Sequence, residues 1–252
     1  MRVPISVGNW KMHSTTAEAD TLCESLVGLG EIEGVISVVA PGFLQLARVA
    51  ECFRGSGVGV AGQNMHSADE GAFTGEVSPK QLVEVADWVI LGHSERRQFF
   101  CEDETALKRK VEAAFAHGLQ PILAVGERAE ERQSDRTEAV LRRQLQGALT
   151  GVELPARFVV AYEPVWAIGS GTPASGELAQ EAAALIRRVL SELQDDALAE
   201  SARILYGGSV KANNIAEFAA QPDVDGALVG GAALEAEQFM AITRAIAAAK
   251  SS

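Results

Sequence analysis

Short apolar runs, rich in β-branched residues and followed by turn-forming residues, recur along the whole chain and predict β-strands. The eight candidate strands are 5–7, 35–39, 58–61, 88–91, 122–125, 158–161, 204–206 and 227–229. Longer stretches between them carry apolar residues at helical spacing, as at Leu141, Leu145 and Leu149. The chain is therefore expected to alternate strands with helices.

Strands that alternate with helices pair in parallel through right-handed crossovers. An open doubly wound sheet and a closed barrel both satisfy this order. The strand count favours the barrel, and no Gly-x-Gly-x-x-Gly motif follows the first strand. The 252 residues divided by eight give about 31 per unit, close to the size of a strand plus its crossover helix. We predict one α/β domain over residues 1–252, a (β/α)8 barrel of eight parallel strands inside an outer ring of helices.

Composition and charge indicate which kinds of molecule the protein can bind. The chain is 47% hydrophobic, and its 34 acidic and 22 basic side chains give a formal net charge of -12. Such a surface repels nucleic acid and anionic membranes, so we expect neither as a partner. A small anionic ligand stays compatible with this charge, because the potential in a pocket depends on nearby Lys, Arg and backbone N–H groups.

The cysteines and the N-terminus bear on the compartment. Cys23, Cys52 and Cys101 are widely spaced and form no Cys-x-x-Cys, which indicates neither a disulfide framework nor a thiolate metal site. No His-x-x-x-His or acidic cluster at ligand spacing suggests a metal. The N-terminus lacks the apolar core of a signal peptide, and no later run approaches about 18 apolar residues. We expect a cytoplasmic protein without a membrane span.

Polar residues follow the candidate strands at the end where barrels of this kind place their active sites. They include Asn9, Lys11, His93, Glu95, Glu127, Glu163, Ser209 and the glycine pairs 207–208 and 230–231. Two connections, 62–77 and 164–176, are longer than a turn needs, which is typical of functional loops. The sequence thus places a Lys, a His, carboxylates and flexible backbone on one rim.

These residue types suit the removal of a proton next to a carbonyl group. A neutral imidazole can polarise a carbonyl, a carboxylate can accept a C–H proton, and an ammonium group can hold nearby negative charge. Pro164 favours an extended conformation at Glu163, which could aim that carboxylate across the barrel mouth. A packing role for His93 and an ion pair of Glu163 with an arginine are the structural alternatives.

The glycine pairs after the last two strands have a physical use. Without a Cβ, the backbone can turn its N–H groups toward an anion at close range. Barrels of this kind most often hold phosphate at the loops after these two strands. Tight turns without a ligand are the alternative, but the position of both pairs favours a phosphate site.

Five motifs, in order along the chain, resemble those of triosephosphate isomerases. They are GNWKM at 8–12, GHSERR at 92–97, AYEPVWAIG at 161–169, YGGSV at 206–210 and LVGGA at 228–232. The resemblance covers residues 8–234. It implies a TIM barrel that interconverts dihydroxyacetone phosphate and D-glyceraldehyde 3-phosphate through an enediolate, in glycolysis and gluconeogenesis. It also implies that the reaction needs no cofactor and no metal.

The resemblance further implies a role for each rim residue. Glu163 would be the base that moves the proton, and His93 the neutral electrophile at the substrate oxygens. Lys11 and Asn9 would supply electrostatic stabilisation, and Glu95 would support the site.

The phosphate group would be bound by backbone and by a closing loop. Its contacts would be Gly169, Ser209, Gly230 and Gly231. Residues 164–174 resemble the family's lid, in which Ile168 and Leu228 would press on Glu163. The sequence departs from the family at 172–174, Thr-Pro-Ala where many members read Lys-Thr-Ala, and at Ala124 and Ala233, where Cys and Ser are common. The proline bears on the opening rate of the lid, because it fixes φ and removes an N–H.

A further stretch resembles the loop by which each subunit of the family reaches into its partner. This stretch is AFTGE at 72–76. It implies a homodimer through the 62–77 loop, in which Thr74 of one subunit braces Lys11 of the other.

Two other functions are compatible with the fold. Another phosphosugar barrel isomerase would share the glycine pairs but would not require Lys11, His93 and Glu163 together. A non-catalytic barrel scaffold would be expected to have lost at least one of these three residues, and this sequence retains all three.

Overall fold

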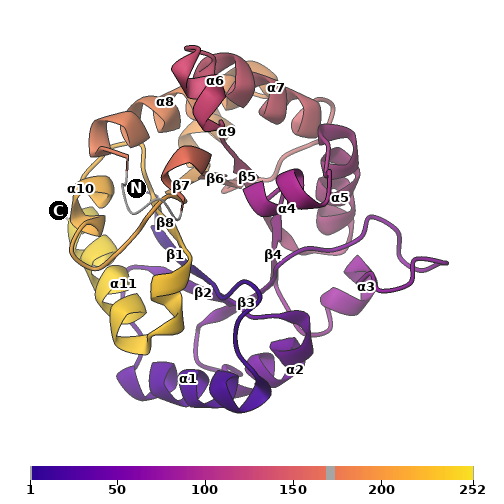
Figure 1. Cartoon of the computed structure of the whole chain (residues 1–252), viewed down its shortest axis with the longest axis vertical. Coiled ribbons are helices and arrows are strands. Elements are labelled where there is room, and N and C mark those ends of the chain that lie inside the picture. The colour runs from indigo at the N-terminus through magenta and orange to yellow at the C-terminus, as the bar shows by residue number, and fades with distance from the viewer. Residues whose placement is uncertain (1, 169–173, 252) are drawn as a thin grey trace.

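The eight strands form a closed barrel in the computed structural model, which describes residues 2–168 and 174–251 (Figure 1). The strands are β1 (Ile5–Asn9), β2 (Ile36–Ala40), β3 (Gly59–Gly62), β4 (Trp88–Leu91), β5 (Gln120–Val125), β6 (Val159–Tyr162), β7 (Arg203–Tyr206) and β8 (Gly226–Val229). Each strand pairs in parallel with its neighbours in chain order, and β8 closes the barrel by pairing with β1. The predicted (β/α)8 barrel is confirmed, and the open sheet is wrong.

Helices surround the barrel, as Figure 1 shows. They are α1 (Thr16–Leu29), α2 (Phe43–Cys52), α3 (Pro79–Leu82), α4 (Ser94–Phe99), α5 (Glu104–Ala116), α6 (Ala129–Gln133), α7 (Thr137–Leu149), α8 (Gly176–Leu193), α9 (Asp196–Ser201), α10 (Ile215–Ala219) and α11 (Ala236–Lys250), with 3-10 turns η1 (Val165–Ala167) and η2 (Gly231–Leu234). Within the described part of the chain, none of them has the length and apolar character needed to cross a membrane.

The fourth strand has the predicted bounds, 88–91, and the other seven differ from their predictions by one or two residues at an end. The prediction begins the sixth strand at Phe158, whereas β6 begins at Val159. Phe158 is buried and packs edge-on against Phe115 of α5, with ring centroids 6.0 Å apart. An apolar side chain beside a strand is buried whether or not its backbone belongs to the barrel, so hydrophobicity alone misplaces the boundary.

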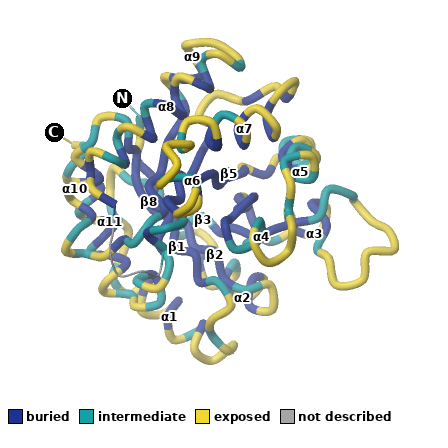
Figure 2. The backbone as a smooth tube through the Cα atoms, turned by 45° about the horizontal axis from the view of Figure 1, so that its top comes forward, coloured by how far each residue is buried: buried dark blue, intermediate teal, exposed yellow. Residues whose placement is uncertain are grey.

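Alternate side chains of each strand fill two different layers. Ile5 and Val7 of β1 belong to a cluster that also takes in one or two residues of every other strand and fills the barrel interior. Ser6, between them, turns outward, and its hydroxyl lies 2.8 Å from that of Thr243 on α11. The larger cluster lies between barrel and helices, so the strands are buried on both faces. The strand residues are accordingly mostly in the buried class, dark blue in Figure 2.

A buried ion network joins the start of β8 to the helix layer. The Asp225 carboxylate accepts hydrogen bonds from Arg187 at 3.1 Å, from Arg2 at 2.6 Å and from the backbone N–H of Ile204 at 2.9 Å. Its side chain is only 4% exposed. The network lies at the N-terminal ends of β7 and β8, which is the stability face of such a barrel.

Asp225→Ala should lower the free energy of unfolding by about 3 kcal/mol or more, because Arg2, Arg187 and the backbone N–H of Ile204 all lose the same buried acceptor. Urea unfolding followed by circular dichroism measures this. Asp223→Ala is the matched control, since Asp223 also pairs with Arg187, at 2.7 Å, but is 24% exposed and should cost less. Equal losses in the two variants would contradict the importance of the buried network.

Candidate active site

The strand ends bring the predicted catalytic side chains to the mouth of the barrel. Asn9 is the last residue of β1, His93 caps the N-terminus of α4 just after β4, and Glu163 follows β6 directly. Lys11 stands two residues beyond β1 in the left-handed backbone conformation, with φ of 53°. That conformation is uncommon for a residue with a side chain.

Glu163 rests against the N-terminus of α4. One carboxylate oxygen, Oε1, lies 2.9 Å from Nε2 of His93, and the other accepts the backbone N–H of Ser94 at 2.7 Å. The Glu163 side chain is 2% exposed and that of His93 is 7% exposed. The alternative of an arginine partner for Glu163 is therefore wrong: its partners are an imidazole and a helix N-terminus, which also favours negative charge.

Burial and pairing shift the pKa values of Glu163 and His93 in opposite directions. Burial by itself would raise the pKa of Glu163, but His93, the Ser94 N–H and Lys11 together hold that pKa below its ordinary value. Burial lowers the pKa of His93, while the Glu163 carboxylate and Glu95 raise it more, so the net pKa lies above its ordinary value. The Glu163 carboxylate is therefore ionised at neutral pH, in spite of its burial.

A hydrogen bond at the second ring nitrogen of His93, Nδ1, determines which nitrogen carries the proton in the neutral ring. The backbone N–H of Glu95 donates to Nδ1 at 3.3 Å, so Nδ1 acts as an acceptor. In the neutral ring the proton must then be on Nε2, which faces Glu163 and the barrel mouth. This hydrogen bond favours a neutral imidazole with its N–H directed into the site.

Lys11 is fixed on the other side of the mouth. Its ammonium group lies 2.6 Å from Oε1 of Glu95, and its backbone N–H donates to the Asn9 side chain at 3.0 Å. The Gln63 amide donates to the backbone oxygens of Lys11 and Ala40, at 2.8 and 2.9 Å. Gln63 thus supports the unusual backbone of Lys11, a contribution that its place at the start of a loop does not reveal.

The glycine pairs 207–208 and 230–231 differ in what a Cβ at each position would contact. A Cβ on Gly207 would lie 3.0 Å from Cγ of Glu163, and one on Gly208 would overlap the hydroxyl of Tyr206. Close packing explains these two positions. At Gly230 a Cβ would instead meet Lys11, 3.5 Å from its Cε, and at Gly231 it would meet open space. The pair after β8 therefore leaves free room beside the ammonium group.

A second carboxylate organises the start of the predicted lid. Glu127, fully buried, accepts hydrogen bonds at Oε1 from the Tyr162 hydroxyl at 3.0 Å and from the Trp166 indole at 2.8 Å. The Arg132 guanidinium lies 4.8 Å from the centre of the Trp166 ring. The rim position of Glu127 was visible in the sequence, but the cluster joins residues that are distant in the chain, and sequence spacing does not predict it.

The described parts of the lid are its two ends. At the near end, Pro164 and Ile168 flank the η1 turn, and at the far end the N–H of Ala174 donates to the hydroxyl of Tyr206 at 3.2 Å. Leu228 belongs to the barrel interior and is 3% exposed. The expected contacts of Ile168 and Leu228 with Glu163 stay predictions. Gly169, Thr172 and Pro173 lie outside the described residues.

Ser209 lies just beyond β7, where its backbone oxygen accepts a hydrogen bond from Asn214 at 2.9 Å.

Thr74 does not join its own chain's site. It is exposed in the loop between β3 and α3, which extends beyond the ring of helices (Figures 1 and 2). Inside that loop the rings of His66 and Phe73 contact each other at a tilt of 32°, with centroids 4.0 Å apart. His117, the C-cap of α5, lies 3.1 Å from Asp69.

In the ranges 2–168 and 174–251, no group of three or more His, Cys, Asp or Glu side chains is arranged to hold a metal ion. The barrel mouth brings together the ionised carboxylate of Glu163, the imidazole N–H of His93 and the ammonium group of Lys11, beside the glycine backbone at 230–231. Such a set can remove a proton beside a carbonyl and stabilise the negative charge that results.

Comparison with known proteins agrees with this chemistry. The model of the family described as "Triosephosphate isomerase" matches residues 4–246. Curated proteins named triosephosphate isomerase are 48% identical to the chain in Chloroflexus aurantiacus, 47% in Carboxydothermus hydrogenoformans and 48% in Clostridium acetobutylicum. The matches cover 96–97% of this chain and 98–99% of each relative. The chain belongs to the triosephosphate isomerase family, and its function is the isomerisation of a triose phosphate.

Proposed function

We propose that the barrel mouth interconverts dihydroxyacetone phosphate and D-glyceraldehyde 3-phosphate through an enediolate, with Glu163 as the base. The observation that carries this proposal is the position of Glu163, buried, ionised and 2.9 Å from the His93 imidazole. A carboxylate held in this way is free to accept a proton as soon as a substrate carbon replaces its present partners. It would take the proton from one carbon and return it to the next.

His93 acts on the substrate oxygens. Its Nε2–H points into the mouth, where it can donate to the carbonyl oxygen and then to the hydroxyl oxygen of the substrate. The Glu163 carboxylate raises the pKa of His93 only while the two side chains are paired. When Glu163 turns to the substrate, the effect of burial dominates and lowers that pKa, so the neutral ring acts as the electrophile.

Lys11 and Asn9 supply the electrostatic stabilisation. The ammonium group is paired with Glu95 and lies beside Gly230, where a negative substrate would meet both the charge and the free backbone. We assign the phosphate to the backbone at Gly169, Ser209, Gly230 and Gly231. Glu95 holds Lys11 by its carboxylate and His93 by its N–H, so it supports two catalytic residues at once.

The 164–174 segment closes over the substrate in this proposal. An enediolate beside a phosphate can eliminate that phosphate, so closure must exclude water and hold the leaving group. Ile168 and Leu228 would then press on Glu163 and desolvate it, which strengthens it as a base. The Glu127 cluster around Trp166 provides the fixed end from which the segment moves.

The chain acts as a homodimer in the cytoplasm, in glycolysis and gluconeogenesis. The surface around the mouth supports the dimer: Met12 is 97% exposed and Leu44 93% exposed, beside the ends of β1 and β2. Phe43, next to Leu44 in the chain, is 41% exposed as well. Exposed apolar side chains that gather into a patch mark an interaction surface. The loop 62–77 of a second copy would cover them and bring its Thr74 to Lys11.

Glu163→Gln should lower kcat by at least about 10² to 10⁴-fold, because the amide cannot accept the proton. A coupled assay of glyceraldehyde 3-phosphate isomerisation measures the loss, and circular dichroism checks the fold. Glu138→Gln, on the exposed surface of α7, is the charge-matched control and should retain activity. A Glu163→Gln variant that is nearly as active as the wild type would show that another group is the base.

Thr74→Arg should weaken the dimer and lower kcat, because it places a second positive charge next to the partner's Lys11. Sedimentation velocity across a dilution series measures the dissociation, and the coupled assay is run at the same concentrations. Thr21→Arg on the exposed face of α1 is the control for added charge and bulk. A fully active monomer of the wild-type protein would contradict both the dimer and the role of Thr74.

A further inference from the structure

Two of the three cysteines come together on the outside of the barrel. Cys23 lies in the middle of α1 and is buried, at 2% exposure, whereas Cys52 is the last residue of α2 and is exposed. They stand 29 positions apart in the sequence, which is why the spacing suggested no disulfide. Helix α1 packs against α2, and the two thiols are within hydrogen-bond contact of each other.

The register of the two helices accounts for this contact. Both helices connect a strand to its next parallel neighbour, so they run in the same direction. One turn before the cysteines, Asp20 of α1 forms an ion pair with Arg48 of α2. Cys23 follows Asp20 by three residues and Cys52 follows Arg48 by four, so the thiols lie on the same facing sides one turn further on.

The two thiols differ in reactivity. Burial, contact with Cys52 and the nearby carboxylates of Asp20 and Glu24 together raise the pKa of Cys23 to about 12. Cys23 is thus protonated at neutral pH and does not react first with an oxidant. Cys52 is accessible to solvent, so oxidation begins there.

We infer that Cys23 and Cys52 form a redox modification site that a peroxide converts into a disulfide between α1 and α2. Hydrogen peroxide oxidises the Cys52 sulfur: its O–O bond breaks, a sulfenic acid forms and one water leaves. The Cys23 sulfur then attacks the Cys52 sulfur, the S–S bond forms, the S–O bond breaks, and the hydroxide leaves as water with the Cys23 proton. The two thiols lose two electrons, and one peroxide becomes two waters.

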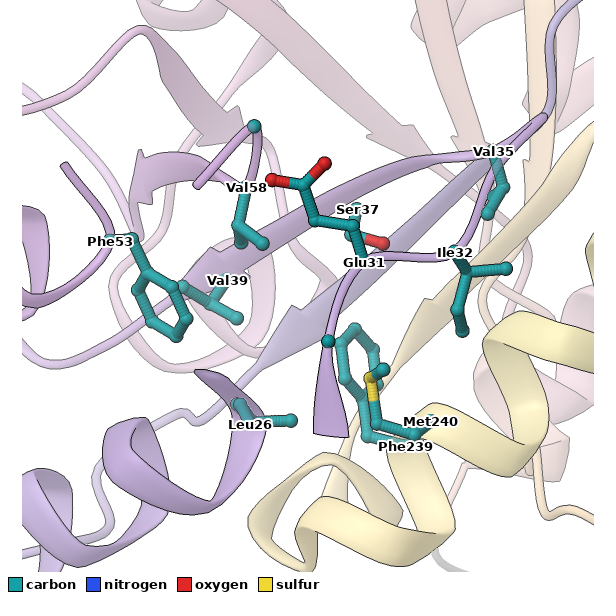
Figure 3. A pocket seen from close by; sticks show the side chains of 12 residues that line it. Leu26, Glu31, Ile32, Val35, Ser37, Val39, Phe53, Val58, Phe239 and Met240 are labelled. Carbon is teal, nitrogen blue, oxygen red and sulfur yellow. The ribbon is translucent and has the colours of Figure 1, made fainter. Parts of the chain in front are cut away.

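The disulfide should persist once it has formed. A thiol with a raised pKa is a poor leaving group, so exchange at Cys52 that expels Cys23 is slow. The pocket of about 60 Å³ nearby is lined by Leu26, one turn after Cys23, and by Phe53, directly after Cys52, but by neither cysteine (Figure 3).

The site is separate from the catalytic mouth. Cys52 ends α2 on the side where β3 begins, and the next residues, Phe53 and Arg54, line a surface with the N-terminal ends of β3 and β4. Oxidation should therefore stabilise the barrel and leave turnover unchanged. The inference does not depend on the roles proposed above for Glu163 and His93.

The test is peroxide treatment of the Cys101→Ser protein followed by trypsin digestion without reductant. Cleavage after Lys11, Arg48 and Arg54 places Cys23 in the peptide 12–48 and Cys52 in the peptide 49–54. We expect mass spectrometry to find these two peptides joined, with the mass of two hydrogens lost. The melting temperature should rise by roughly 5–10 °C, as expected for a disulfide that closes a loop of this size, and kcat should not change.

Cys52→Ser in the same background is the matched control, because the exposed position tolerates the change, and it should show neither the joined peptide nor the rise in melting temperature. Oxidation of Cys52 to a sulfinic or sulfonic acid while the Cys23 peptide stays unlinked would overturn the inference. So would a disulfide between two copies of Cys52 in place of the Cys23–Cys52 link.

Discussion

The contact between His93 and Glu163 is the interaction on which the rest of the site depends. A carboxylate that is 2% exposed stays charged only if hydrogen bonds and opposite charge offset its loss of water. The imidazole and the Ser94 N–H do this, and they come from the end of β4, while Glu163 comes from the end of β6. Strands β4 and β6 both pair with β5 in parallel, and this arrangement brings their C-terminal ends close enough for the hydrogen bonds to form.

The charge of the chain sets a second constraint. With a net charge of -12, the protein attracts no anion by its average surface. Positive potential for a phosphorylated substrate must be local, and we propose that Lys11 and the backbone N–H groups of the glycine-containing loops supply it. The strained backbone at Lys11, held by Gln63 and Asn9, places the ammonium group beside Gly230. A basic protein can attract an anion with the positive charge of its whole surface. In this acidic protein a few hydrogen bonds instead hold one ammonium group in place.

The sequence predicts the barrel because strand and helix periodicities are local properties that can be recognised along the chain. It places Lys11, His93 and Glu163 on one rim because parallel strands end at the same face. It does not predict the ion pair of Lys11 with Glu95 or the cluster at Glu127, since these join residues 84 and 35 positions apart. The contact between Cys23 and Cys52 depends in the same way on the register of two helices.

The central claim is that Glu163 and His93 form one electrostatic unit, and an NMR titration of the His93 imidazole tests it most directly. In the wild-type protein without substrate, the pKa of His93 should lie above its ordinary value of 6.5, because the carboxylate outweighs burial. In Glu163→Gln the carboxylate charge is gone, so that pKa should fall below the wild-type value. An unchanged pKa in the variant would contradict the account.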